Sequence, residues 1–235
     1  HHIGMSTHNP KVAKLAALSG VVEIILFSIN PAFDLLPASE DLNTYFADSY
    51  AEDLNGIDPE RAELYQVCEQ RGIGITVMKG YAGGRLFSPQ TSPFGVALTP
   101  VQCIHYALTR PGVASILAGY DSTEHVTQAV AYETATSKEK DYASVLAHAP
   151  HHAYTGQCTY CGHCAPCPAG IDVAMVNKLY DLATMQEEVP STIKAHYESL
   201  SAGAKDCIAC GGCEVRCPFD VPVVERMKRA TVLFQ

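Results

Sequence analysis

Eight of the ten cysteines in this chain lie in two runs near its C-terminus. The first run reads Cys158-Thr-Tyr-Cys161-Gly-His-Cys164-Ala-Pro-Cys167-Pro168, and the second reads Cys207-Ile-Ala-Cys210-Gly-Gly-Cys213-Glu-Val-Arg-Cys217-Pro218. Each run spaces its cysteines closely and ends in Cys-Pro. Three closely spaced thiolates can bind three irons of a cubane cluster, and a more distant fourth completes the site. The two runs therefore predict two [4Fe–4S] clusters.

The last cysteine of each run is predicted to bind the cluster of the other run, as in two-cluster ferredoxins. One cluster is assigned to Cys158, Cys161, Cys164 and Cys217. The second cluster is assigned to Cys207, Cys210, Cys213 and Cys167. The second run has the standard C-x2-C-x2-C-x3-C-P spacing, but the first is one residue shorter before Cys167. The shorter spacing changes the geometry expected around Cys167 and not the type of cluster.

Zinc and disulfides are the alternative uses of these cysteines. Zinc ribbons need only two C-x2-C pairs, without a third cysteine or a following proline. Disulfides are disfavoured because the chain is large enough for a core and C-x2-C thiols make poor structural bridges. Cys68 and Cys103 have apolar neighbours, so both are predicted to be small buried groups. His148, His151 and His152 are interpreted as part of a solvated joint, because no carboxylate or cysteine shares their spacing.

Composition limits the class of protein. The chain has 235 residues, of which 47% are hydrophobic and 17% charged, so it can form one large or two ordinary globular domains. The net charge of −9 argues against nucleic acid or an anionic membrane as the main partner. No membrane span or signal peptide is indicated, and thiolate-bound clusters favour a reducing cytoplasm. The chain does not begin with Met and residues 3–8 read as a strand end, so we expect a piece of a longer protein.

The first 135 or so residues alternate strand and helix signals. Strands are expected at residues 3–6, 21–29, 73–78 and 113–118, and helices at 11–19, 58–71, 99–109 and 121–132. Asn9-Pro10, Asp58-Pro59 and Thr99-Pro100 mark helix starts, because proline suits the first helical position. The apolar run 21–29 is typical of parallel strands that are buried on both faces. Four βα units in succession predict a parallel sheet, and four units are half of an eight-stranded barrel. The long acidic connection at 30–56 would lie on the face where such barrels place their active sites.

The pattern changes after residue 136. Residues 137–148 are expected to form a linking helix, and further helices are expected near residues 176–183, 190–200 and 223–234. We therefore predict an α/β plus α chain: residues 1–136 form the second half of a (β/α)8 TIM-type barrel, and residues 137–235 form an α-helical, ferredoxin-like dicluster domain.

Several segments support a family resemblance. They are Ile3-Gly-Met-Ser-Thr-His8, Leu26-Phe-Ser-Ile-Asn-Pro31, Gly74-Ile-Thr-Val-Met78 with Gly83-Gly84, and Val113-Ala-Ser-Ile-Leu-Ala-Gly119 with Ser122, Glu124 and His125. Together they resemble the second half of the aldo/keto reductase barrel. The cysteine-rich extension resembles the subgroup of predicted aldo/keto reductases that carry a ferredoxin-type domain.

The resemblance implies which residues contact a nicotinamide cofactor. Ser6 would meet the nicotinamide carboxamide, the loop Gly83-Gly84-Arg85 would approach the pyrophosphate, and Gly119 with Ser122 would face phosphate at a helix N-terminus. Gly83-Gly84 fits a simple tight turn equally well. Thr7 and Leu26 stand where the family has amide side chains, so a weak nicotinamide site or another cofactor, such as a flavin, stays open. The family's catalytic Asp, Tyr, Lys and His precede this chain, so no catalytic residue is assigned and the chain alone is expected to be inactive.

Three functions follow from these patterns. In the first, the complete protein is an oxidoreductase acting on a small molecule, whose barrel exchanges electrons with the two clusters. In the second, the chain relays electrons between partner proteins and the barrel part is a scaffold. In the third, the clusters only stabilise the C-terminal domain. A half barrel leaves strand edges uncovered, so a homodimer or pairing with a missing N-terminal half is expected.

Overall fold

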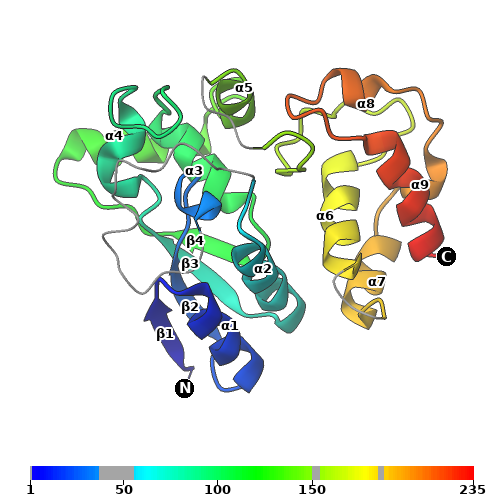
Figure 1. Cartoon of the computed structure of the whole chain (residues 1–235), viewed down its shortest axis with the longest axis horizontal. Helices are drawn as coiled ribbons and strands as arrows, with labels where there is room; N and C mark the ends of the chain where they lie inside the picture. Colours follow the sequence, from blue (N-terminus) through cyan, green and yellow to red (C-terminus); the bar gives the residue numbers. More distant parts are fainter. Residues whose placement is uncertain (1, 37–55, 150–153, 185–187) are drawn as a thin grey trace. The chain divides into compact units, whose positions relative to one another are not determined.

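The computed structural model describes residues 2–36, 56–149, 154–184 and 188–235. The chain divides into two compact units, His1–Ala153 and Tyr154–Gln235 (Figure 1). The predicted connection at 30–56 and the joint at 148–152 are only partly within the described residues. No described helix is long and apolar enough to cross a membrane.

The first unit contains a parallel sheet whose strands alternate with helices. In chain order the described elements are β1 (Gly4–Thr7), α1 (Pro10–Ser19), β2 (Ile24–Ser28), α2 (Pro59–Arg71), β3 (Gly74–Met78), α3 (Pro100–Leu108), β4 (Val113–Ile116) and α4 (Thr123–Val130). Short 3-10 helices lie at Phe33–Leu35, Ala82–Phe87 and Ala131–Glu133. The strands pair in the order β1-β2-β3-β4, and each pair is parallel. The predicted βα alternation is confirmed, and the sheet is compatible with part of a βα barrel.

Local sequence explains where three of these helices begin. The Asn9 side chain accepts hydrogen bonds from the backbone N–H groups of the first turn of α1, and Asp58 does the same for α2. Thr99 and Gln102 form a capping box at the start of α3. A proline follows each cap, where its missing N–H has no helical partner to lose. The helix starts predicted from the three dipeptides are therefore confirmed.

One face of the central strands is buried and the other is open. Ile25 and Phe27 of β2 and Ile75 and Val77 of β3 are fully buried. Phe27 contacts α2, where the Tyr65 ring meets it edge-on at a centroid distance of 6.3 Å. On the opposite face Ile24 is 47% exposed. The expected burial on both faces is therefore not met at the start of β2 within the described residues, whereas Ser28 at the end of the same face is fully buried.

A buried polar cluster anchors the segment that follows β2. The Asp34 carboxylate accepts hydrogen bonds from the hydroxyls of Tyr65 (2.5 Å) and Tyr106 (2.7 Å) and lies 3.8 Å from Nη1 of Arg61. Arg61 also donates to the carbonyls of Ser28 and Leu36. Burial raises the pKa of Asp34, and the charge of Arg61 opposes that shift. The cluster fixes the chain between the sheet and α2, since a buried carboxylate needs such partners.

The helix α5 (Tyr142–Ala147) packs within the first unit. The Gln102 side chain in α3 donates a hydrogen bond of 2.8 Å to the carbonyl of Asp141. Tyr142 is fully buried, and its ring meets that of Tyr106 edge-on at 5.2 Å. The units therefore divide at residues 153/154, whereas the sequence placed the division at 136/137 and treated this helix as a link.

The second unit consists of helices and cysteine-rich loops. Its described elements are α6 (Val173–Thr184), α7 (Ser191–Glu198), a 3-10 helix (Ala204–Asp206), α8 (Gly212–Val215) and α9 (Val223–Leu233). Leu179, Leu182, Ala183 and Ile193 form one buried apolar cluster of this unit. The Tyr197 and Phe234 rings stack at 4.0 Å and close this cluster beside α7 and α9. The helices predicted after each cysteine run are confirmed.

Candidate functional sites

The two cysteine runs share the same left-handed backbone positions around their second cysteine, although their sequences differ. Tyr160 and Ala209, each placed just before the second cysteine of its run, have positive φ values of 56° and 53°. The glycines that follow the second cysteines, Gly162 and Gly211, are also left-handed. Side chains other than glycine adopt this conformation at a cost, so the surrounding structure must impose it. The repeated left-handed positions bend both loops in the same way at the second cysteine. They give the unit a local internal repeat.

Each run leads into a helix through matching apolar anchors. Ile171 and Val173 follow the first Cys-Pro, and Val221 and Val223 follow the second. All four side chains are at most 4% exposed. These anchors tie the cysteine loops to the start of α6 and the start of α9, so the sulfur positions depend on packed helices.

The eight cysteines line two hollows of the second unit. Cys158, Cys161, Cys164 and Cys217 line the first hollow. Cys167, Cys207, Cys210 and Cys213 line the second, and Cys164 also reaches it. Each hollow therefore takes three cysteines from one run and the Cys-Pro cysteine from the other. Cys210 is exposed and the other seven are partly buried.

The chemistry of these two sets suits iron–sulfur clusters. Four cysteine sulfurs are the usual ligands of a [4Fe–4S] cluster. Among the described residues, no three His, Cys, Asp or Glu side chains come close enough together to hold a single metal ion. The first set would hold one cluster and the second set the other, with the membership predicted from the spacing.

The thiols of the first hollow differ in acidity. Burial raises the pKa of Cys158 and of Cys164 to about 12. Burial acts on Cys161 in the same direction, but His163, whose Nδ1 lies 3.4 Å from the sulfur, outweighs it and the pKa of Cys161 is lowered. Thiols must lose their protons to bind metal, so loading this hollow would release protons.

Polar contacts connect the first cysteine loop to two helices. The Tyr160 hydroxyl donates a hydrogen bond of 2.9 Å to Asp181 in α6. Arg226 in α9 donates to the other oxygen of the same carboxylate at 2.5 Å. Arg226 also donates to Asn177 and lies 5.1 Å from the centre of the Tyr180 ring. The network holds α6, α9 and the loop that carries Cys158 in one arrangement.

Residues 157–222 match the protein family described as the 4Fe-4S dicluster domain. This segment is an iron–sulfur dicluster domain. It contains all eight clustered cysteines, so the predicted [4Fe–4S] pair is confirmed, and such domains serve electron transfer. Which cysteine binds which cluster stays a prediction. No curated protein and no solved structure matches the chain. The family match includes no residue of the first unit, where the aldo/keto reductase resemblance stays a prediction.

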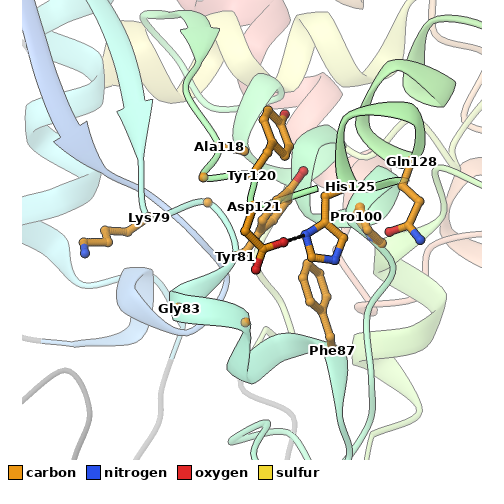
Figure 2. A pocket seen from close by; sticks show the side chains of 13 residues that line it. Lys79, Tyr81, Gly83, Phe87, Pro100, Ala118, Tyr120, Asp121, His125 and Gln128 are labelled. Carbon is orange, nitrogen blue, oxygen red and sulfur yellow. Dashed lines mark ion pairs between the residues drawn. The ribbon is translucent and has the colours of Figure 1, made fainter. Parts of the chain in front are cut away.

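The first unit has a cavity of about 570 Å³ at the carboxyl ends of β3 and β4. The rings of Tyr81, Phe87, Tyr120 and His125 gather in it, while the side chain of Lys79 extends away from them (Figure 2). The Tyr81 and Phe87 rings lie 4.9 Å apart, and burial, together with neighbouring Tyr120, raises the pKa of Tyr81. His125 Nδ1 pairs with the Asp121 carboxylate at 2.7 Å. Aromatic rings line one part of the cavity, and glycine backbone lines another part.

The structure brings together some of the residues that the resemblance implies for a cofactor. Gly83, Gly84 and Gly119 line the cavity. Arg85 and Ser122 are not among the described residues that line it. Arg85 donates through Nε to the carbonyl of Thr91, and the Ser122 hydroxyl accepts from the His125 backbone N–H as the N-cap of α4. Ser6 is exposed on β1, where it pairs in register with Leu26.

Sequence reasoning missed several features of these sites. Lys79 ends β3 with a φ of 59°, and no residue pattern signals a left-handed lysine. The Asp121–His125 pair could have been found from its i,i+4 spacing. Arg216 contacts the opposite cysteine run, more than 45 residues away, and no local pattern indicates that contact.

Proposed function

We propose that the protein is an iron–sulfur oxidoreductase related to the aldo/keto reductases, in which a barrel active site exchanges electrons through two [4Fe–4S] clusters. The observation that carries the proposal is a dicluster domain whose cysteines line two hollows in two sets of four. The parallel βα sheet in the same chain supports the barrel part, because enzymes with such sheets place their active sites at the carboxyl ends of the strands. A reducing cytoplasm suits thiolate-bound clusters.

In this proposal the cysteines hold the clusters in crossed sets. Cys158, Cys161 and Cys164 with Cys217 bind one cluster, and Cys207, Cys210 and Cys213 with Cys167 bind the other. The clusters, when bound, supply transfer of single electrons. The protein keeps the sulfurs in place through the left-handed loop positions and the buried anchors at the starts of α6 and α9.

The cavity of the first unit is proposed to bind the phosphates of a dinucleotide such as NAD(P)H. Its volume is within the usual range for ligand sites. Gly83, Gly84 and Gly119 permit a close approach of the backbone, and α4 begins beside the cavity. Asp121 also lines the cavity and would repel phosphate, although its carboxylate is engaged by His125 Nδ1 at 2.7 Å.

Nicotinamide transfers a hydride, whereas the clusters accept one electron at a time. Linking the two requires a group that accepts two electrons and releases them singly, and a flavin has that chemistry. We therefore propose that the complete protein uses such a group, while the residues of this chain alone do not reduce a carbonyl substrate.

The deciding experiment is an anaerobic assay of iron, sulfide and cluster reduction. We expect about eight irons per chain and electron paramagnetic resonance signals after reduction with dithionite. Reduction of the clusters by NAD(P)H would support the enzyme. Gly119→Val should weaken NAD(P)H binding, since a side chain at Gly119 meets no atom within 4 Å and would fill the approach to the cavity. Ala131→Val adds similar bulk at an exposed position outside the cavity and serves as the control.

An electron relay between partner proteins is the second candidate. One observation favours it: the second hollow reaches the surface, where Cys210 is exposed and the nearby Ile208 and Val215 are 67% and 89% exposed. Exposed apolar side chains of this kind suit a transient protein contact. Clusters that dithionite reduces and NAD(P)H never reduces would favour the relay. Clusters without redox activity would favour a structural role.

The open face of the sheet points to a further contact in either function. Ile24 on this face is 47% exposed, and Ile3 and Val21, which precede β1 and β2, are 53% and 57% exposed. We propose that additional barrel strands or a second copy of the chain covers this face. A monodisperse monomer in light scattering would contradict the second copy.

A further inference from the structure

Two short segments connect the cysteine sets. The segment 164–167 connects Cys164 of the first hollow to Cys167 of the second. The segment 213–217 connects Cys213 of the second hollow to Cys217 of the first. Each segment therefore determines the separation of two ligands that belong to different clusters. Both sets of four cysteines can bind a cluster only if these two segments lie correctly relative to each other.

The two segments differ in length. Two residues separate the last cysteines of the first run, whereas three separate those of the second. The longer segment contains most of α8 and also Arg216, which stands just before Cys217 and has no counterpart in the shorter one. The asymmetry places one arginine at the point where the two cysteine runs meet.

The guanidinium group of Arg216 binds the backbone of the shorter segment. Its Nη2 donates to the carbonyl oxygens of Cys164 at 2.6 Å and Pro166 at 2.9 Å, and its Nε donates to that of His163 at 3.3 Å. The group also lies against Gly212, where an added Cβ would stand 3.3 Å from Nη1. Arg216 lines the second hollow as well. One side chain thus contacts both cysteine runs and the edge of a cluster site.

We propose that Arg216 is a positioning residue that holds the crossed cysteines Cys167 and Cys217 in place and raises the reduction potential of the cluster in the second hollow. The planar fork of arginine carries several fixed donors, so it can bind three carbonyl groups of one loop at once. A lysine at this position would keep the positive charge but could not reproduce the fork. The charge favours the reduced, more negative cluster, because hydrogen bonding and charge near the sulfurs tune these potentials. The inference rests on the proposed cluster assignment.

Two variants of the full chain separate the roles of fork and charge. Arg216→Gln removes both, whereas Arg216→Lys removes only the fork. Arg229→Gln is the matched control, because Arg229 is an exposed arginine of α9 that lines neither hollow. Each protein is purified anaerobically. Iron and sulfide per chain, the rate of iron release to a chelator, and both reduction potentials are then measured, with helical circular dichroism as the check on folding.

We expect both Arg216 variants to release iron about tenfold faster or more, as for other losses of groups that orient metal ligands. One potential should become more negative in Arg216→Gln and stay close to wild type in Arg216→Lys. Wild-type release and potentials in Arg216→Gln would overturn the inference. If Arg216→Gln does not fold, the release rate of Arg216→Lys decides in the same way. A wild-type chain that binds far fewer than eight irons would instead refute the proposed function.

Discussion

Crossed ligation makes a prediction that pairs of cysteine substitutions can decide. The two hollows assign Cys217 to the same set as Cys158, although it follows Cys207 in the chain. Removing one of four thiolates should empty that cluster site, so Cys158→Ala, Cys207→Ala and Cys217→Ala should each keep about four of about eight irons. The single variants show that the sites load independently, and the double variants show which cysteines share a site.

The double variants give opposite results under the two ligand arrangements. With crossed ligation, Cys158→Ala/Cys217→Ala damages one site twice and should retain about four irons, while Cys207→Ala/Cys217→Ala damages both sites and should retain almost none. If each run bound its own cluster, the two results would be exchanged. The assay is iron and sulfide per chain after anaerobic purification, supported by the number of spins in the reduced protein.

A retained cluster in Cys207→Ala/Cys217→Ala together with an empty Cys158→Ala/Cys217→Ala would refute the crossed assignment. Cys68→Ala is the control, because Cys68 is fully buried in the first unit and should leave the iron content unchanged. The predicted burial of Cys68 and Cys103 is confirmed, and burial raises the pKa of each thiol to about 12. Neither cysteine lines a hollow, so neither is expected to bind iron.

Four further outcomes test the packing that supports the sites. Asp34→Ala should lower the free energy of unfolding by about 3–5 kcal/mol, because two tyrosine hydroxyls and a guanidinium lose a fully buried carboxylate; exposed Asp121→Ala is the control in denaturant unfolding. Arg226→Met should cost about 1.5–3 kcal/mol through its lost charged hydrogen bonds, and an unchanged midpoint would contradict this role. Leu182→Ala should cost about 2–5 kcal/mol, whereas Val232→Ala, at a 73% exposed side chain, should cost little. Removing iron with a chelator should abolish the visible absorption but leave most of the helical circular dichroism.

Features fixed by neighbouring residues could be predicted from the sequence. Asn9, Asp58 and Thr99 cap helices through contacts within three residues, so their dipeptides with proline located the helix starts. The cysteine spacing is also a short-range signal, and it predicted the iron–sulfur clusters. The four strands alternate with these helices along the chain, so their order also followed from local signals.

Features that depend on distant contacts could not be predicted. The Asp34 carboxylate meets Tyr106, 72 positions later, and the sequence shows only an acidic connection there. The Gln102 side chain in α3 bonds to the carbonyl of Asp141 at the start of α5, a contact over 39 positions that helps to place α5 in the first unit. The bonds from Arg216 to Cys164 and Pro166 likewise span about fifty residues. In each case the two partners meet only in the folded chain, so the residues next to either partner do not indicate the contact.

The location of the buried apolar side chains bears on how far the second unit depends on its clusters. One buried apolar cluster of the second unit, formed by Leu179, Leu182, Ala183 and Ile193, lines neither hollow. Other buried apolar side chains, such as Val173, Val223 and Met227, do line the hollows. The helices α6, α7 and α9 therefore share one apolar cluster that is separate from the hollows, while the starts of α6 and α9 pack at the hollows themselves. Zinc fingers, in contrast, are unfolded without their metal. The loops depend on metal more than the helices do, since strained left-handed positions flank their cysteines. Removal of iron should therefore disturb the cysteine loops and the starts of α6 and α9 more than the apolar cluster of Leu179, Leu182, Ala183 and Ile193, and circular dichroism of the iron-free chain measures how much helix remains.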